Sequence, residues 1–158
     1  MQRNKKGLWF IVMLIILLIP GCGVREDGVQ LTKRIFYSLC SGNRGAQNWI
    51  AWERLKAVGV DVGATYSSII KEKERVDYRK AFFYNFSMSF RSGGGKTSGF
   101  FNWQVIQKDG TNTVVAADTA SGKSLLFTLS IVDGKQKLTA IEWQGTGTPA
   151  GGQDVSAK

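Results

Sequence analysis

Hydrophobic residues follow three different patterns along this chain. Residues 8–19 form an unbroken apolar run, residues 31–40 and 78–90 place apolar side chains about four apart, and from Ser98 onward apolar and polar residues alternate. A spacing near 3.6 residues indicates a helix, and a spacing of two indicates a strand. The sequence therefore predicts helices first and strands afterwards, behind an apolar N-terminal segment.

The first helix is predicted to begin after Asp27, which is a good N-cap residue. Leu31, Ile35 and Leu39 recur every four residues and form its apolar face. Gly42 suits the left-handed conformation that ends many helices, so we expect the helix to stop there.

A second helix is predicted over residues 46–56, where Trp49, Trp52 and Leu55 are spaced by three. Two tryptophans on one helix are compatible with a ligand pocket, but such a stripe belongs more often to a core. We therefore interpret both as core residues. Residues 58–63 are predicted to turn the chain before a further helix.

The aromatic stretch that follows the charged run 71–75 fits two periods. Tyr78, Phe82, Phe86 and Phe90 repeat every four residues, which indicates a helix. Aromatic residues in the same stretch also alternate with small polar residues, which indicates a strand. We favour the helix because the charged run before it is helical in composition, and the strand remains the alternative.

Four strands are predicted after residue 98, because apolar and polar residues alternate between turn signals such as Asp109-Gly110 and Asp133-Gly134. Short connections favour a sequential antiparallel meander. The predicted fold class is α+β, with about three N-terminal helices packed on a curved, cone-like four-stranded antiparallel meander. We expect one domain over residues 28–144 and a disordered tail over residues 145–158.

The closing hairpin pattern resembles a known superfamily. Residues 125–129, Asp133-Gly134 and residues 138–143, together with the tryptophan-bearing second helix, are similar to the nuclear transport factor two-like proteins of the cystatin-like superfold. The resemblance implies a cone of curved sheet closed by helices. It does not imply one function, because enzymes, carriers and interaction modules share that fold.

The N-terminal segment has the features of a secretory leader. Residues 1–7 contain three basic residues and no acid, and the apolar run that follows is short for a membrane-spanning helix, which needs about 20 residues. Residues 19–22, Ile-Pro-Gly-Cys, resemble the lipobox of bacterial lipoproteins. This resemblance implies a signal peptide over residues 1–21 and cleavage between Gly21 and Cys22. It also implies diacylglycerol on the Cys22 thiol and, usually, an acyl chain such as palmitate on the new amino group.

The resemblance to lipoproteins also predicts where the protein lies. Residues 22–27 form a short tether, so the domain is expected close to the membrane, on the periplasmic side of the cell envelope. Lipoproteins that carry aspartate after the lipidated cysteine can be retained at the inner membrane. Gly23 stands there in this chain, which favours the outer membrane.

Composition limits the chemistry. The chain contains no histidine, which excludes Ser-His-Asp and Cys-His catalysis and removes the commonest metal ligand. The net charge of +9 falls to +6 without the leader, with 18 Lys and Arg against 12 Asp and Glu. No basic cluster interleaved with aromatic residues appears, so we expect no nucleic-acid partner. We predict no metal site and no cofactor, and we interpret Cys40 as a small buried apolar residue.

The glycine-rich residues 92–97 invite interpretation as a phosphate-binding loop. The motif requires a glycine where Phe90 stands, and it requires a helix after the loop where a strand is predicted here. We therefore interpret this segment as a flexible connection.

Three functions compete on these grounds. The first is a non-catalytic interaction module that binds an envelope protein near the membrane. The second is a carrier or sensor that holds a small apolar ligand or lipid in the cone. The candidate pocket residues for it are Trp103, Phe101, Phe127, Trp143, Phe86 and Glu142.

The third and least favoured function is an acid–base enzyme. It would use Glu142 or Asp77 together with Tyr78 or Tyr84. For Glu142, an exposed position on the outward face of an edge strand is the simpler interpretation. We therefore assign no catalytic residue from the sequence.

Overall fold

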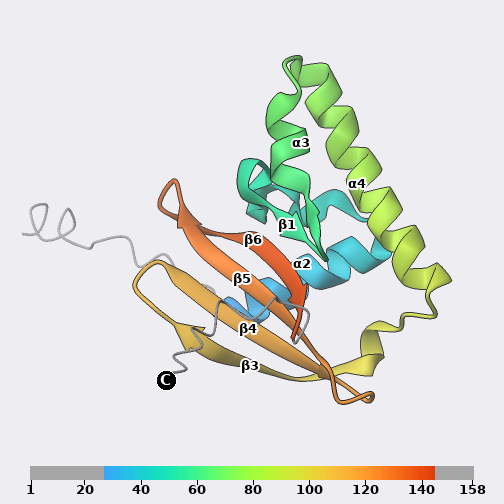
Figure 1. Cartoon of the computed structure of the whole chain (residues 1–158), viewed down its shortest axis with the longest axis vertical. Coiled ribbons are helices and arrows are strands. Elements are labelled where there is room, and N and C mark those ends of the chain that lie inside the picture. Colours follow the sequence, from blue (N-terminus) through green and yellow to red (C-terminus); the bar gives the residue numbers. More distant parts are fainter. Residues whose placement is uncertain (1–26, 145–158) are drawn as a thin grey trace, which may run out of the picture.

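The computed structural model of the protein describes residues 27–144, which form helices and a single mixed sheet (Figure 1). The elements in chain order are α2 (Gly28–Ser41), the 3-10 helices η1 (Arg44–Trp49) and η2 (Trp52–Arg54), β1 (Lys56–Ala57), β2 (Val60–Asp61), α3 (Val62–Ser68), α4 (Glu72–Ser92), the 3-10 helix η3 (Thr97–Gly99), β3 (Phe100–Lys108), β4 (Asn112–Thr119), β5 (Ser124–Val132) and β6 (Lys135–Trp143).

The predicted four-stranded antiparallel meander is wrong. The sheet has six strands in the order β2-β1-β6-β5-β4-β3, and β1 pairs with β6 in parallel. Strands β3 to β6 are antiparallel neighbours, but β1 and β2 extend the sheet beyond β6. Each added strand has two residues, which is too short to show any period in the sequence.

The predicted helix over residues 46–56 is also wrong. The chain there forms two short 3-10 helices and then β1. Ile50 forms an isolated parallel bridge with Leu138, and the Ala51 amide donates to the Leu138 carbonyl at 2.9 Å. These bonds to the sheet take the place of the helical bonds of residues 50 and 51, so tertiary pairing overrides the local helical pattern.

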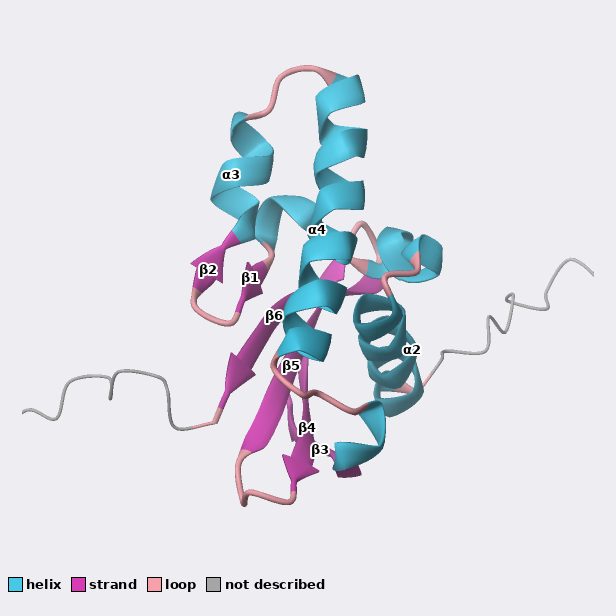
Figure 2. Ribbon diagram, turned by 90° about the vertical axis from the view of Figure 1, so that its right-hand side faces the viewer, coloured by secondary structure: helices cyan, strands magenta, loops and turns pink. Residues whose placement is uncertain are grey.

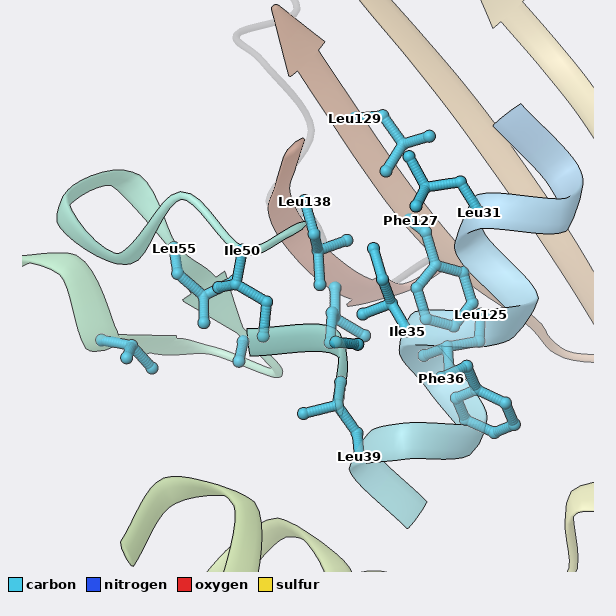
Figure 3. Packing of buried hydrophobic residues seen from close by; sticks show 14 of the residues in the cluster. Leu31, Ile35, Phe36, Leu39, Ile50, Leu55, Leu125, Phe127, Leu129 and Leu138 are labelled. Carbon is cyan, nitrogen blue, oxygen red and sulfur yellow. The ribbon is translucent and has the colours of Figure 1, made fainter. Parts of the chain in front are cut away.

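Helix α2 confirms the first prediction. The Asp27 carboxylate accepts from the Val29 amide at 3.4 Å, and Gly42 ends the helix with φ 74°. Figure 3 shows Leu31 and Ile35 directed toward Phe127 and Leu129 of β5. The helix packs across one face of the sheet, and this contact forms the core of the molecule.

Helix α4 includes residues 82–90, which confirms the favoured helix over the alternative strand. It stands beside α2 and extends beyond the end of the sheet (Figure 2). Only Phe83 and Ser87 of α4 are buried, and Ser87 lies against Gly42 at the end of α2. The Gly95 amide donates to the Phe90 carbonyl at 2.8 Å, so the glycine-rich segment ends α4.

Several predictions concern residues outside the described range. The leader, the lipobox with Cys22, most of the short tether and the C-terminal tail belong to this group. Within residues 27–144, no helix combines the length and the apolar character that crossing a membrane requires.

Candidate functional site

An apolar cavity of about 530 Å³ lies between α4 and the end of the sheet where β6 finishes. Its lining comes from eight elements and from the turn between β1 and β2. The lining residues are Phe36, Ala57, Val58, Val60, Val62, Tyr78, Ala81, Phe82, Asn85, Phe86, Ser89, Phe90, Phe100, Leu125, Ile141 and Trp143.

Helix α4 supplies the longest wall of the cavity. Tyr78, Phe82, Phe86 and Phe90, which we call the aromatic ladder, are each partly buried and all line it. Residues four apart lie on one face of a helix, so a single stripe of α4 covers the cavity along three turns. The aromatic ladder also packs against the edge of the core, where Phe82 contacts Trp52 and Phe90 contacts Phe36.

The sheet and α2 form the floor. Phe36, Leu125 and Ile141 are at most 4% exposed and lie beneath the cavity. The β1–β2 turn forms part of the rim, with Val58 49% and Val60 60% exposed. Val58 has φ 49° and Gly59 has φ 81°, so the turn is tight, and Val60 pairs with Ala57 across it.

The cavity offers few polar groups. The polar residues among the described lining are Tyr78, Asn85 and Ser89, the Trp143 indole N–H is a further donor, and no lining residue is Asp, Glu, Lys or Arg. All three polar residues lie on α4. Such a lining can bind an apolar molecule and can orient one polar group, but it holds no acid–base pair.

The aromatic residues that were predicted to form the pocket lie in three different places. Phe86 and Trp143 line the cavity, whereas Trp103 and Phe127 stack at 5.5 Å within the core beneath α2. Phe101 is 49% exposed on the outer strand β3.

Sequence reasoning missed much of the lining. The aromatic ladder was recognised as a helix signal, yet only Phe86 was chosen as a pocket residue. Its i, i+4 spacing places Tyr78, Phe82 and Phe90 on the same helix face as Phe86, but it does not tell whether that face covers a core or a cavity. Val58 and Val60 gave no signal, because their strands are too short to show a pattern.

The predicted acid–base groups are not brought together. Glu142 is exposed on β6, and Asp77 is exposed and pairs with Lys80 at 3.1 Å. Tyr84 is 63% exposed, and of these four residues only Tyr78 lines the cavity. Within residues 27–144, no group of three or more His, Cys, Asp or Glu side chains is placed to hold a metal ion.

Cys40 lies in the core at 4% exposure and forms no disulfide within residues 27–144, and its burial confirms its interpretation as a buried apolar residue. Burial raises the pKa of its thiol to about 12, because the thiolate would lose its hydration there. The thiol is therefore protonated at neutral pH and is a poor nucleophile.

A second hollow, of about 500 Å³, is polar. It lies beside η1 and the β5–β6 turn and includes Arg79, Lys135 and Lys137. Lys137 pairs with Asp133 at 3.1 Å, and Arg79 pairs with Glu72 at 3.1 Å. Two of its three cations are thus compensated within the described chain, and this hollow is a weaker candidate than the apolar cavity.

No family model matches the sequence, and no curated protein matches it either. The resemblances to lipoproteins and to the nuclear transport factor two-like fold therefore stay predictions. The functional argument depends on the geometry of the cavity.

Proposed function

We propose that this protein is a membrane-anchored carrier or sensor that holds a small apolar ligand, or one lipid chain, in the cavity beneath α4. The observation that supports it is the apolar cavity of about 530 Å³. Ligand sites have volumes of about 300–1,000 Å³ and are mostly apolar with a few polar groups. The described lining fits that pattern, and the proposed function is non-catalytic.

The energetics suit reversible binding. Each buried methylene contributes about 0.8 kcal/mol, so about ten methylenes contribute about 8 kcal/mol. Association costs about 4–15 kcal/mol, which is of the same order. Such a site would capture an alkyl chain and release it again, as a carrier or sensor must.

A cavity-filling variant tests the proposal. Ala81 of α4 lines the cavity, and its side chain is exposed. We expect Ala81→Trp to occupy the space and to reduce labelling by a photoreactive long-chain alcohol about tenfold, the equivalent of about 1.4 kcal/mol. The measurement is cross-linking to the full chain in lipid nanodiscs, with labelled peptides identified by mass spectrometry.

Ala64→Trp is the matched control, because Ala64 is an exposed alanine of α3 outside the cavity lining. Its labelling should equal that of the wild type. Equal labelling of both variants and the wild type, or labelling of the wild type away from the lining residues, would contradict the proposal.

A second candidate function is an interaction module that binds an envelope protein through β3. This strand lies at the edge of the sheet and exposes Phe101, Val105 and Ile106 by 49%, 41% and 48%. Exposed apolar side chains on an edge strand favour pairing with another strand. Phe101→Lys and Ile106→Lys should then abolish a cross-link to a partner in membranes while leaving alcohol labelling intact.

A further inference from the structure

We propose that the ligand carries an uncharged head group that both donates and accepts hydrogen bonds, such as a hydroxyl or an amide, and that Asn85 binds this head group. This inference rests on the proposed function, since it names the class of ligand that the same cavity accepts. The inference predicts that the cavity prefers neutral lipids over fatty acid anions and over cationic amphiphiles.

Two polar side chains of the cavity form one stripe on α4. Asn85 and Ser89 are four residues apart and therefore lie on the same face, one turn from each other. Asn85 is exposed although it lines the cavity, which places it where the cavity meets solvent. An alkyl chain that enters the apolar interior would leave its head group beside this residue.

Asn85 and Ser89 have unused hydrogen-bonding capacity. Among the described residues, neither the Asn85 amide nor the Ser89 hydroxyl has a hydrogen-bond partner. An asparagine amide donates through its nitrogen and accepts through its oxygen, and a serine hydroxyl does both. A hydroxyl or amide head group matches this pair, because it also donates and accepts.

Charged head groups find no counter-charge in the described lining. It contains no lysine or arginine for a carboxylate and no aspartate or glutamate for an ammonium group. Lys80, on the neighbouring turn of α4, already pairs with Asp77 at 3.1 Å. A charged head group beside Asn85 would stay in contact with solvent but would gain no ion pair, whereas a hydroxyl or amide can both donate to and accept from Asn85 and Ser89.

The aromatic lining raises a competing possibility, since rings also attract quaternary ammonium groups through their faces. Here the rings contact one another. Phe82 and Phe86 lie 6.2 Å apart between centroids, Phe90 and Phe100 lie 6.1 Å apart, and Phe100 and Trp143 lie 6.4 Å apart. These contacts occupy part of the ring surface that a cation cage would need.

Three photoreactive probes with the same hexadecyl chain test the inference. One carries a hydroxyl, one a carboxylate and one a trimethylammonium group, and each is added at equal mole fraction to nanodiscs that hold the full chain. We expect the alcohol to label α4 and β6 peptides about tenfold more than either ion, the equivalent of about 1.4 kcal/mol, because only the hydroxyl both donates to and accepts from Asn85 and Ser89 while neither ion finds a counter-charge.

Variants of Asn85 and Ser89 test which side chain binds the head group of the ligand. Asn85→Leu should lower alcohol labelling about fivefold, which corresponds to the loss of about one hydrogen bond. It should leave labelling by the two charged probes unchanged. Asn48→Leu is the matched control, because Asn48 is exposed in η1 and does not line this cavity.

The outcomes separate the two proposals. Equal labelling by all three probes, or preference for an ion, overturns the head-group inference and leaves the proposed function intact. Unchanged alcohol labelling in both Asn85→Leu and Ser89→Ala overturns the role of the polar stripe. If no probe labels the lining peptides, the proposed function itself fails.

Discussion

At the scale of single residues, burial sets the chemistry of the protein's described cysteine. Cys40 follows Leu39 at the end of α2, and both side chains are buried in the core. The thiolate would be desolvated there, and the pKa of the thiol rises from an ordinary 9.0 to about 12. Folding therefore favours the neutral thiol.

This shift predicts a dependence of stability on alkaline pH. Between pH 9.0 and about 12 the unfolded chain releases the Cys40 proton while the folded chain keeps it, so the free energy of unfolding falls as pH rises. Cys40→Ala removes the titrating group and should cost about 1 kcal/mol at neutral pH.

Urea unfolding at pH 7 and at pH 10.5 measures both effects. Between pH 7 and pH 10.5 the wild type should lose about 2 kcal/mol more unfolding free energy than Cys40→Ala, so the order of stability of the two proteins should reverse. Parallel pH profiles for the two proteins would contradict the expected shift.

At the scale of elements, the entry to α3 depends on one close backbone approach. A Cβ atom added to Gly63 would lie 2.7 Å from the Glu53 carbonyl oxygen, and the Gly63 amide donates to the Leu55 carbonyl at 2.8 Å. Only glycine permits α3 and η2 to pack this closely. α3 in turn supplies Val62 to the cavity lining.

Gly63→Ala should therefore destabilise the fold by about 2–3 kcal/mol, because backbone atoms must move to admit the methyl group. Gly99→Ala is the control, since nothing lies within 4 Å of its Cβ position. Denaturant midpoints compare the two. Similar midpoints for both variants would show that α3 moves freely relative to η2.

The elements also differ in how far the sequence determines them. α2 and α4 were predicted correctly, because their helical period extends over three turns or more and their packing agrees with it. The segment 46–56 was not, because its backbone bonds to Leu138, a residue remote in sequence. β1 and β2 exist through pairing with β6 and carry no local signal.

The candidate site is likewise only partly determined by local sequence pattern. The aromatic ladder reveals its helix and its common face, but periodicity is identical for a face that covers a core and a face that covers a cavity. Trp103 and Trp143 alternate with polar residues in the same way, yet Trp103 stacks on Phe127 and Trp143 lines the cavity. The surroundings of Trp103 and Trp143 differ because of where α4 lies relative to the sheet, and the local sequence pattern does not contain that information.

At the scale of the whole molecule, the proposed anchor places the cavity near a membrane. We propose that Cys22 carries diacylglycerol, which would leave only a few residues between the lipid and α2. Two or more acyl chains hold a protein stably at a bilayer, whereas one chain alone is marginal.

Cys22→Ala should therefore move the protein from the membrane fraction to the soluble fraction, or leave it as an uncleaved precursor. Fractionation and the intact mass distinguish these states from the lipidated form. Cys40→Ala is the control, and it should retain the lipid mass. A Cys22→Ala protein with the same mass increment as the wild type would contradict lipidation.

The position of β6 has a consequence for biosynthesis. It is the last described strand in the chain, yet it lies between β5 and β1 and pairs with both. While the ribosome is still making residues 135–143, β1 has no parallel partner and the core face of α2 lacks Leu138 and Ile141. The nascent chain therefore cannot complete its sheet before residues 135–143 have emerged, and β1 and β5 gain their shared partner only at that stage.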